Sequence, residues 1–88
     1  MRLPVIKKIN EFIQANDEDF VAETIQVLEF LSEEPSLKEN EVEVIGELLS
    51  NFFGALEVAK EVKNGVDSKT ALNNFMKRVM GSIDKQKL

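Results

Sequence analysis

The side chains in this sequence that could do chemistry are mostly carboxylates, and several of them share one face of a single helix. They fall on a common strip of the helix predicted over 40–64: Glu43, Glu47, Glu57 and Glu61. Inward-facing glutamates hold metal in di-iron bundles, but those sites also need a Glu-x-x-His motif, and the chain has no histidine. The strip therefore predicts a solvated acidic face, with docking of a basic partner as the weaker alternative.

The other residue types that enzymes depend on are scarce. Cysteine and histidine are both absent, which removes the thiol nucleophile, the thiolate metal ligand and the base that titrates near neutral pH. No glycine-rich phosphate loop or Ser/His/Asp set occurs, and Ser82 with Lys85 near the chain end makes a poor catalytic pair. We therefore expect no catalytic residue, no cofactor and no bound metal, and a protein that is not an enzyme.

Charge is unevenly distributed along the 88 residues, whose net charge is -5. Residues 17–61 carry thirteen acids against only Lys38 and Lys60, whereas both ends of the chain are basic. This pattern predicts that the ends pack near the middle, within one chain or between two chains.

A nucleic-acid interface is the alternative function. It would use a basic patch near the C-terminus, made of Lys69, Lys77, Arg78, Lys85 and Lys87. The sequence pI of about 4.7 argues against it, because a protein that binds phosphate backbones is usually basic.

Proline, glycine and hydrophobic periodicity predict an all-α fold in one domain, residues 1–88. The expected helices cover about 4–14, 17–33, 40–64 and 68–84. Pro4 suits a first helical position, Pro35 ends the second helix, and Gly65 follows the third. No apolar run reaches the roughly 18 residues of a membrane span, so we expect no membrane association and a cytoplasmic location.

The third predicted helix is apolar over more than half of its circumference. One sector contains Val42, Ile45, Leu49, Phe52, Leu56 and Ala59. The adjacent sector contains Val44, Leu48, Ala55, Val58 and Val62. A helix on the surface of a monomer needs an apolar stripe of only about 100°. We therefore expect a second copy of the chain to cover part of this helix about a two-fold axis, with a monomeric four-helix bundle as the alternative.

The predicted dimer interface follows mainly the first of these sectors. It comprises Val42, Ile45, Leu49, Asn51, Phe52, Phe53 and Leu56. Asn51 has two interpretations, a buried amide that sets the register across the dimer or a half-exposed amide that binds water.

Two segments resemble a known family. Val44–Phe53 has the aliphatic-aliphatic-Gly-x-aliphatic-aliphatic-Ser-Asn pattern of the YejL-like family, and Phe75, Val79, Ser82 and Ile83 fit its C-terminal pattern. Those are small bacterial helical proteins of unknown function that form homodimers. The whole chain also resembles a small uncharacterised family from Bacteroidetes-type bacteria. The resemblance implies an intertwined helical dimer and no assigned activity. Together these observations predict a non-enzymatic homodimer that serves as a protein interaction or regulatory module, whose partners are itself and an unknown protein.

Overall fold

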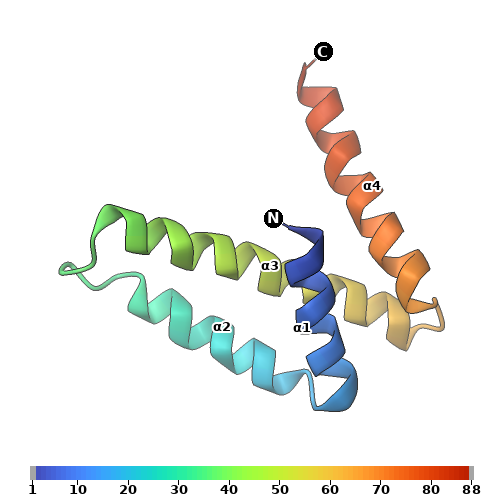
Figure 1. Ribbon diagram of the computed structural model, residues 1–88, viewed down its shortest axis with the longest axis horizontal. Helices are drawn as coiled ribbons and strands as arrows, with labels where there is room; N and C mark the ends of the chain where they lie inside the picture. The colour runs from blue at the N-terminus through green and yellow to red at the C-terminus, as the bar shows by residue number, and fades with distance from the viewer. Residues whose placement is uncertain (1, 88) are drawn as a thin grey trace.

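Four helices make up the computed structural model, which describes residues 2–87, with side chains for residues 2–79. In chain order they are α1 (Leu3–Ala15), α2 (Asp19–Leu31), α3 (Glu39–Lys63) and α4 (Ser68–Lys87) (Figure 1). The all-α class and the long third helix are confirmed, and no strand occurs within residues 2–87. α2 is shorter than the expected 17–33 at both ends. It begins at Asp19 because the Asp17 carboxylate accepts the Asp19 N–H (3.0 Å) in a turn before the helix, and it ends at Leu31, before the expected Glu33.

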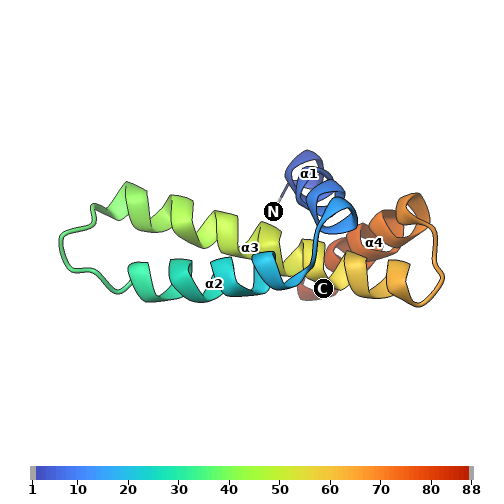
Figure 2. The ribbon, with the colours of Figure 1, turned by 90° about the horizontal axis from the view of Figure 1, so that it is seen from below.

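α3 is the axis on which the other helices pack, and it contacts all three of them. α2 runs beside its first half as an antiparallel hairpin, and α4 turns back from its far end and diverges from it (Figure 1). α1 lies across one face of the layer that α2, α3 and α4 form (Figure 2). The result is flat, with extents of 43 × 40 × 17 Å and a radius of gyration of 14.3 Å. A compact chain of this length would have about 12 Å, so the four helices are packed less closely than in a compact domain.

The core lies where α1 and α4 meet the second half of α3. It consists of Ile6, Ile13, Val21, Ile25, Ala55, Val58, Ala59, Ala71, Leu72 and Phe75. Only Val21 and Ile25 come from α2, and within the first ten residues of α3 Ile45 alone is buried. The outer end of the α2–α3 hairpin therefore has little core of its own.

The reversal from α3 to α4 depends on one glycine and one capping aspartate. Gly65 has φ +100°, and the Val66 N–H donates to the Glu61 carbonyl (3.1 Å), as in a Schellman motif. Asp67 then accepts the Thr70 N–H at 3.1 Å and so caps α4. The Thr70 hydroxyl, followed by this backbone N–H, holds the pKa of Asp67 below its usual value.

Gly54 sits at the closest approach between α3 and its neighbours. A Cβ at this position would lie 3.0 Å from Phe75 Cζ on α4 and 3.2 Å from Ile6 Cδ1 on α1. At Gly46, eight residues earlier in α3, an added Cβ would lie in open space. The two glycines in the interior of α3 therefore have different roles, because only Gly54 allows helices to approach.

We expect Gly46→Ala to raise the free energy of unfolding by about 0.5–1 kcal/mol, because alanine has the higher helix propensity. Gly54→Leu should lower it by about 1–3 kcal/mol through overpacking against Phe75 and Ile6. Urea denaturation followed by circular dichroism measures both values. Equal effects of the two substitutions would contradict the close approach at Gly54.

Candidate interaction surface

One line of residues along α3 is covered at one end and bare at the other. It runs Val44, Leu48, Asn51, Ala55, Val58, in steps of four and three residues that keep it on a single face. Asn51, Ala55 and Val58 are only 1%, 0% and 0% exposed, whereas Val44 and Leu48 are 56% and 37% exposed. α1 crosses this line near Asn51, where the Arg2 N–H donates to Asn51 Oδ1. The same apolar strip therefore continues past α1 without any cover.

α2 carries a second bare stripe beside the first. It buries Val21 and Ile25 against the core, and it leaves the adjacent stripe Phe20, Thr24, Val27 and Leu31 exposed. The 4-3-4 spacing of this stripe is that of a helix seam that packs on another helix. Phe30, 79% exposed, lies next to its outer end. We call the α2 stripe together with Val44 and Leu48 the hairpin face.

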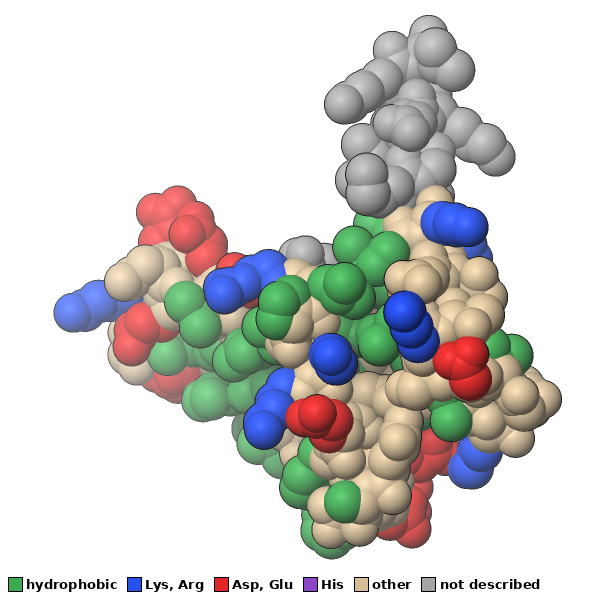
Figure 3. Space-filling view, turned by 45° about the vertical axis from the view of Figure 1, so that its right-hand side comes forward, with side chains coloured by type: hydrophobic (Ala, Val, Ile, Leu, Met, Phe, Trp, Pro, Cys, Tyr) green, Lys and Arg blue, Asp and Glu red, His purple; other side chains and the backbone are tan. Residues whose placement is uncertain are grey.

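A groove of about 400 Å³ joins the hairpin face to α1. Its lining is Lys8, Ile9 and Phe12 of α1, Phe20, Val21 and Thr24 of α2, and Phe52 of α3. Phe12 and Phe20 meet edge to face across it, with ring centroids 5.9 Å apart. Lys8 is the only charged residue in this lining. In Figure 3 hydrophobic side chains continue from the middle of the molecule onto the hairpin. The groove and the hairpin face thus form one continuous apolar surface.

The residues of the predicted dimer interface are divided between the interior and the surface of a single chain. Ile45 and Asn51 are buried, Leu49, Phe52 and Leu56 are half-buried, and Val42 and Phe53 are exposed. The half-buried members pack against the core cluster of the same chain, because α2 lies along this sector of α3. Their contact with a second copy stays a prediction. The α2 stripe was not among the predicted interface residues, although its spacing is visible in the sequence.

Asn51 is buried, and both of its hydrogen bonds are made within one chain. Oδ1 accepts the N–H of Arg2, the residue that precedes α1, and Nδ2 donates to the Glu47 carbonyl, each at 2.8 Å. The Arg2 guanidinium lies 3.9 Å from the Glu47 carboxylate above this bond. Asn51 is therefore buried rather than half-exposed, and its bonds hold the start of α1 on α3. A role in setting the register across a dimer stays a prediction.

The acidic strip of α3 is partly neutralised by basic side chains of the same chain. Arg2 lies near Glu47, and Arg78 of α4 lies 3.3 Å from Glu61. Among the described side chains, no three acidic groups lie close enough together to hold a metal ion.

Of the predicted basic patch, Arg78 pairs with Glu61 and lies over the Phe75 ring, 5.9 Å from its centroid. The side chains of Lys85 and Lys87, like those of Ser82 and Ile83, lie outside the described residues. Binding of nucleic acid stays an untested alternative.

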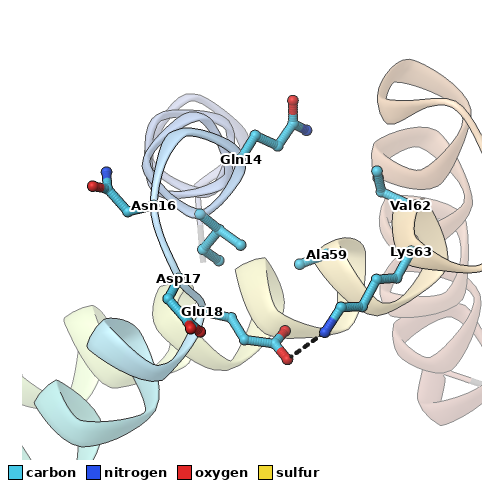
Figure 4. Close-up of a pocket in the computed structure, with 8 residues that line it drawn as sticks. Gln14, Asn16, Asp17, Glu18, Ala59, Val62 and Lys63 are labelled. Carbon is cyan, nitrogen blue, oxygen red and sulfur yellow. Dashed lines mark hydrogen bonds and ion pairs between the residues drawn. The ribbon is translucent and has the colours of Figure 1, made fainter.

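A crevice of about 350 Å³ lies between the turn from α1 to α2 and the end of α3 (Figure 4). Lys63 Nζ and Glu18 Oε1 approach to 2.9 Å across it. The hydrogen bond from Lys63 to Glu18 raises the pKa of Lys63. This shift favours the charged form of Lys63, whereas an amine nucleophile needs a lowered pKa. Because both groups are open to solvent, this ion pair contributes little to the free energy of unfolding.

A polar cluster lies between α1 and the start of α4, beside a cleft of about 560 Å³. Asn10, 2% exposed, accepts hydrogen bonds at Oδ1 from Gln14 (2.7 Å) and from the Ser68 hydroxyl (3.3 Å). Its Nδ2 is buried without a partner. An orphaned donor of this kind costs free energy, so Asn10 is a less favourable buried amide than Asn51.

The chain belongs to a family described as "Family of unknown function (DUF6952)", which matches residues 1–84. The predicted membership of an uncharacterised family is confirmed at that level. No curated protein and no solved structure matches the chain. Across the residues that the structure describes, none of the helices is both long enough and apolar enough to cross a membrane.

We expect the two buried asparagines to respond oppositely to replacement by leucine, which has a similar shape. Asn51→Leu should lower the free energy of unfolding by about 1–3 kcal/mol, because the Arg2 N–H loses its partner. Asn10→Leu should leave stability unchanged or raise it, because it removes an unpaired donor while Gln14 and Ser68 can turn to water. Chemical denaturation of both variants tests this. If Asn10→Leu lowered the free energy of unfolding as much as Asn51→Leu does, the assigned hydrogen bonds would be contradicted.

Proposed function

We propose that this member of a family of unknown function is a non-enzymatic homodimer that acts as a protein interaction or regulatory module in the cytoplasm. The observation that carries the proposal is the apolar line on α3, buried under α1 at Ala55 and Val58 but open to solvent at Val44 and Leu48. Burial of apolar area contributes roughly 25 cal/mol per Å², so a large continuous apolar surface favours association.

The number and placement of exposed apolar side chains also support the dimer. Among the side chains of residues 2–79, ten large hydrophobic ones are exposed, including Phe20, Val27 and Phe30 on α2. Single exposed apolar residues are ordinary, but a continuous patch across two adjacent helices marks an interaction site. A second copy of the chain is the simplest occupant, because a two-fold axis sets each hairpin face against its own equivalent. The resemblance of Val44–Phe53 to the homodimeric YejL-like proteins supports the same arrangement.

The residue types in the chain support a role without catalysis. With no histidine or cysteine, an enzyme would have to rely on carboxylates, lysines or hydroxyl groups. Lys63 is held protonated by Glu18, and the pKa of Asp67 is lowered by its capping bonds. Both shifts favour the ordinary charged forms, whereas an active site usually needs the opposite shift. The lack of cysteine also agrees with the proposed cytoplasmic location.

Sedimentation equilibrium at micromolar concentration should give twice the 10.0 kDa chain mass, about 20 kDa. Val27→Glu should shift the protein toward the single-chain mass, because it places a charge in the centre of the hairpin face. Val27 is 64% exposed in one chain, so the substitution should leave the helical circular dichroism spectrum intact.

Gln26→Glu is the matched control. Gln26 is exposed and points about 100° around α2 from Val27. Gln26→Glu therefore adds the same charge outside the hairpin face. We expect Gln26→Glu to retain the mass of the parent protein. A mass of 10 kDa for the unmodified chain at these concentrations would overturn the proposal.

A further inference from the structure

We infer that the two copies pack their hairpin faces in antiparallel orientation, so that the outer end of each hairpin fills the α1 groove of the other copy. The inference rests on the proposed dimer and specifies its geometry. Leu31 of the second copy would then lie against Phe12 and Phe20, where the groove is open. Each groove is incomplete in one chain, and the partner supplies the side chain that closes it.

The first argument is charge. The outer end of the hairpin is strongly acidic and carries Glu29, Glu33, Glu34, Glu39, Glu41 and Glu43 against Lys38 alone. α1 carries Lys7 and Lys8 against Glu11, and Arg2 directly precedes it. A parallel dimer would place one acidic end on the other, and like charges brought together cost several kcal/mol. An antiparallel dimer places each acidic end beside the α1 of the second copy.

The second argument is the position of α1 on the molecule. α1 stands on the same face as the α2 stripe, because Phe12 of α1 packs on Phe20 of α2. It occupies the inner end of that face and leaves the outer end free (Figure 2). A second hairpin can therefore lie on the free part only if its own end stops at the flank of α1. That flank is the groove, lined by Ile9 and Phe12.

The third argument is the register of the α2 stripe. In an antiparallel pair the stripe Phe20, Thr24, Val27, Leu31 matches its own reverse, with Phe20 opposite Leu31 and Thr24 opposite Val27. A 4-3-4 spacing reads the same from either end, so Phe20 meets Leu31 and Val27 meets the small side chain of Thr24. The groove beside Phe20 then receives an aliphatic side chain, which fits its apolar lining.

The absence of cysteine allows an unambiguous test by crosslinking single-cysteine variants. Phe20→Cys and Leu31→Cys proteins are purified separately, unfolded together, refolded as a mixture, and treated with a bismaleimide that spans about 10 Å, the usual distance between packed helices. The mixture should give a band at about 20 kDa on a denaturing gel, twice the 10.0 kDa chain. Each variant alone should remain at the single-chain mass, because equal positions lie at opposite ends of the pair.

A second pair guards against loss of folding when Phe20 is replaced. Lys8→Cys changes an exposed residue of the groove, and its mixture with Leu31→Cys should crosslink as well. Gln26→Cys, which lies outside the α2 stripe and about 100° around the helix from Val27, is the matched control. Its mixture with Leu31→Cys should not crosslink. Crosslinks in Leu31→Cys alone, or with Gln26→Cys, in a protein of dimeric mass would overturn the antiparallel geometry and leave the dimer standing. A monomeric mass before any crosslinking would instead overturn the proposed function.

Charge reversal gives an independent measurement of the same contact. Lys8→Glu should raise the dimer dissociation constant several-fold at low salt, because it faces the acidic hairpin end of the second copy. The difference should shrink at about 1 M salt, where the Debye length falls to about 3 Å. Lys60→Glu makes the same change outside the groove and should have a smaller effect. An equal effect of both substitutions would contradict the placement of the hairpin end beside Lys8.

Discussion

The structure depends on how α1 is seated on α3, because α3 is apolar over more surface than any single neighbour can cover. The position of α1 on α3 is specified by a buried hydrogen bond and by a glycine in α3. Asn51 accepts the N–H of Arg2 at one end of α1, and Gly54 lets Ile6 and Phe75 approach the α3 backbone. A helix of 13 residues that crosses rather than follows α3 covers only part of its length. The rest of the apolar line is exposed as a direct consequence.

This seating also explains the division of the molecule into a packed half and an open half. α1, α4 and the second half of α3 share a buried core, to which α2 adds Val21 and Ile25. Beyond Ile25 and Ile45 the hairpin carries apolar side chains on its surface but no interior. A two-helix hairpin with so little core is marginal on its own. In the proposed dimer, burial of its open face would add to the stability of this half.

Several features of the fold could be predicted from local patterns. Pro4 and Gly65 mark helix ends by local backbone chemistry, and Gly65 indeed adopts positive φ after α3. Pro35 lies in the loop after α2, which already ends at Leu31. The excess apolar surface of α3 is likewise a property of spacing alone. The packing partner of each apolar face of α3 could not be predicted in the same way. Periodicity shows which residues form an apolar face but not which helix covers it. α2 of the same chain packs on α3, and Leu49, a residue of the predicted dimer interface, packs against the core of its own chain.

The amino-acid sequence by itself determined the all-α class, the number of helices, the uneven charge and the lack of histidine and cysteine, because these follow from composition and from local backbone preferences. Only the tertiary structure decided that Asn51 binds the start of α1, that Asn10 is left with an unpaired donor, and that the α2 stripe is bare. The reason is that each of these depends on where a distant helix crosses. Residues 2 and 51 are far apart along the chain, and the periodicity of α1 and α3 does not predict the angle at which the two helices cross.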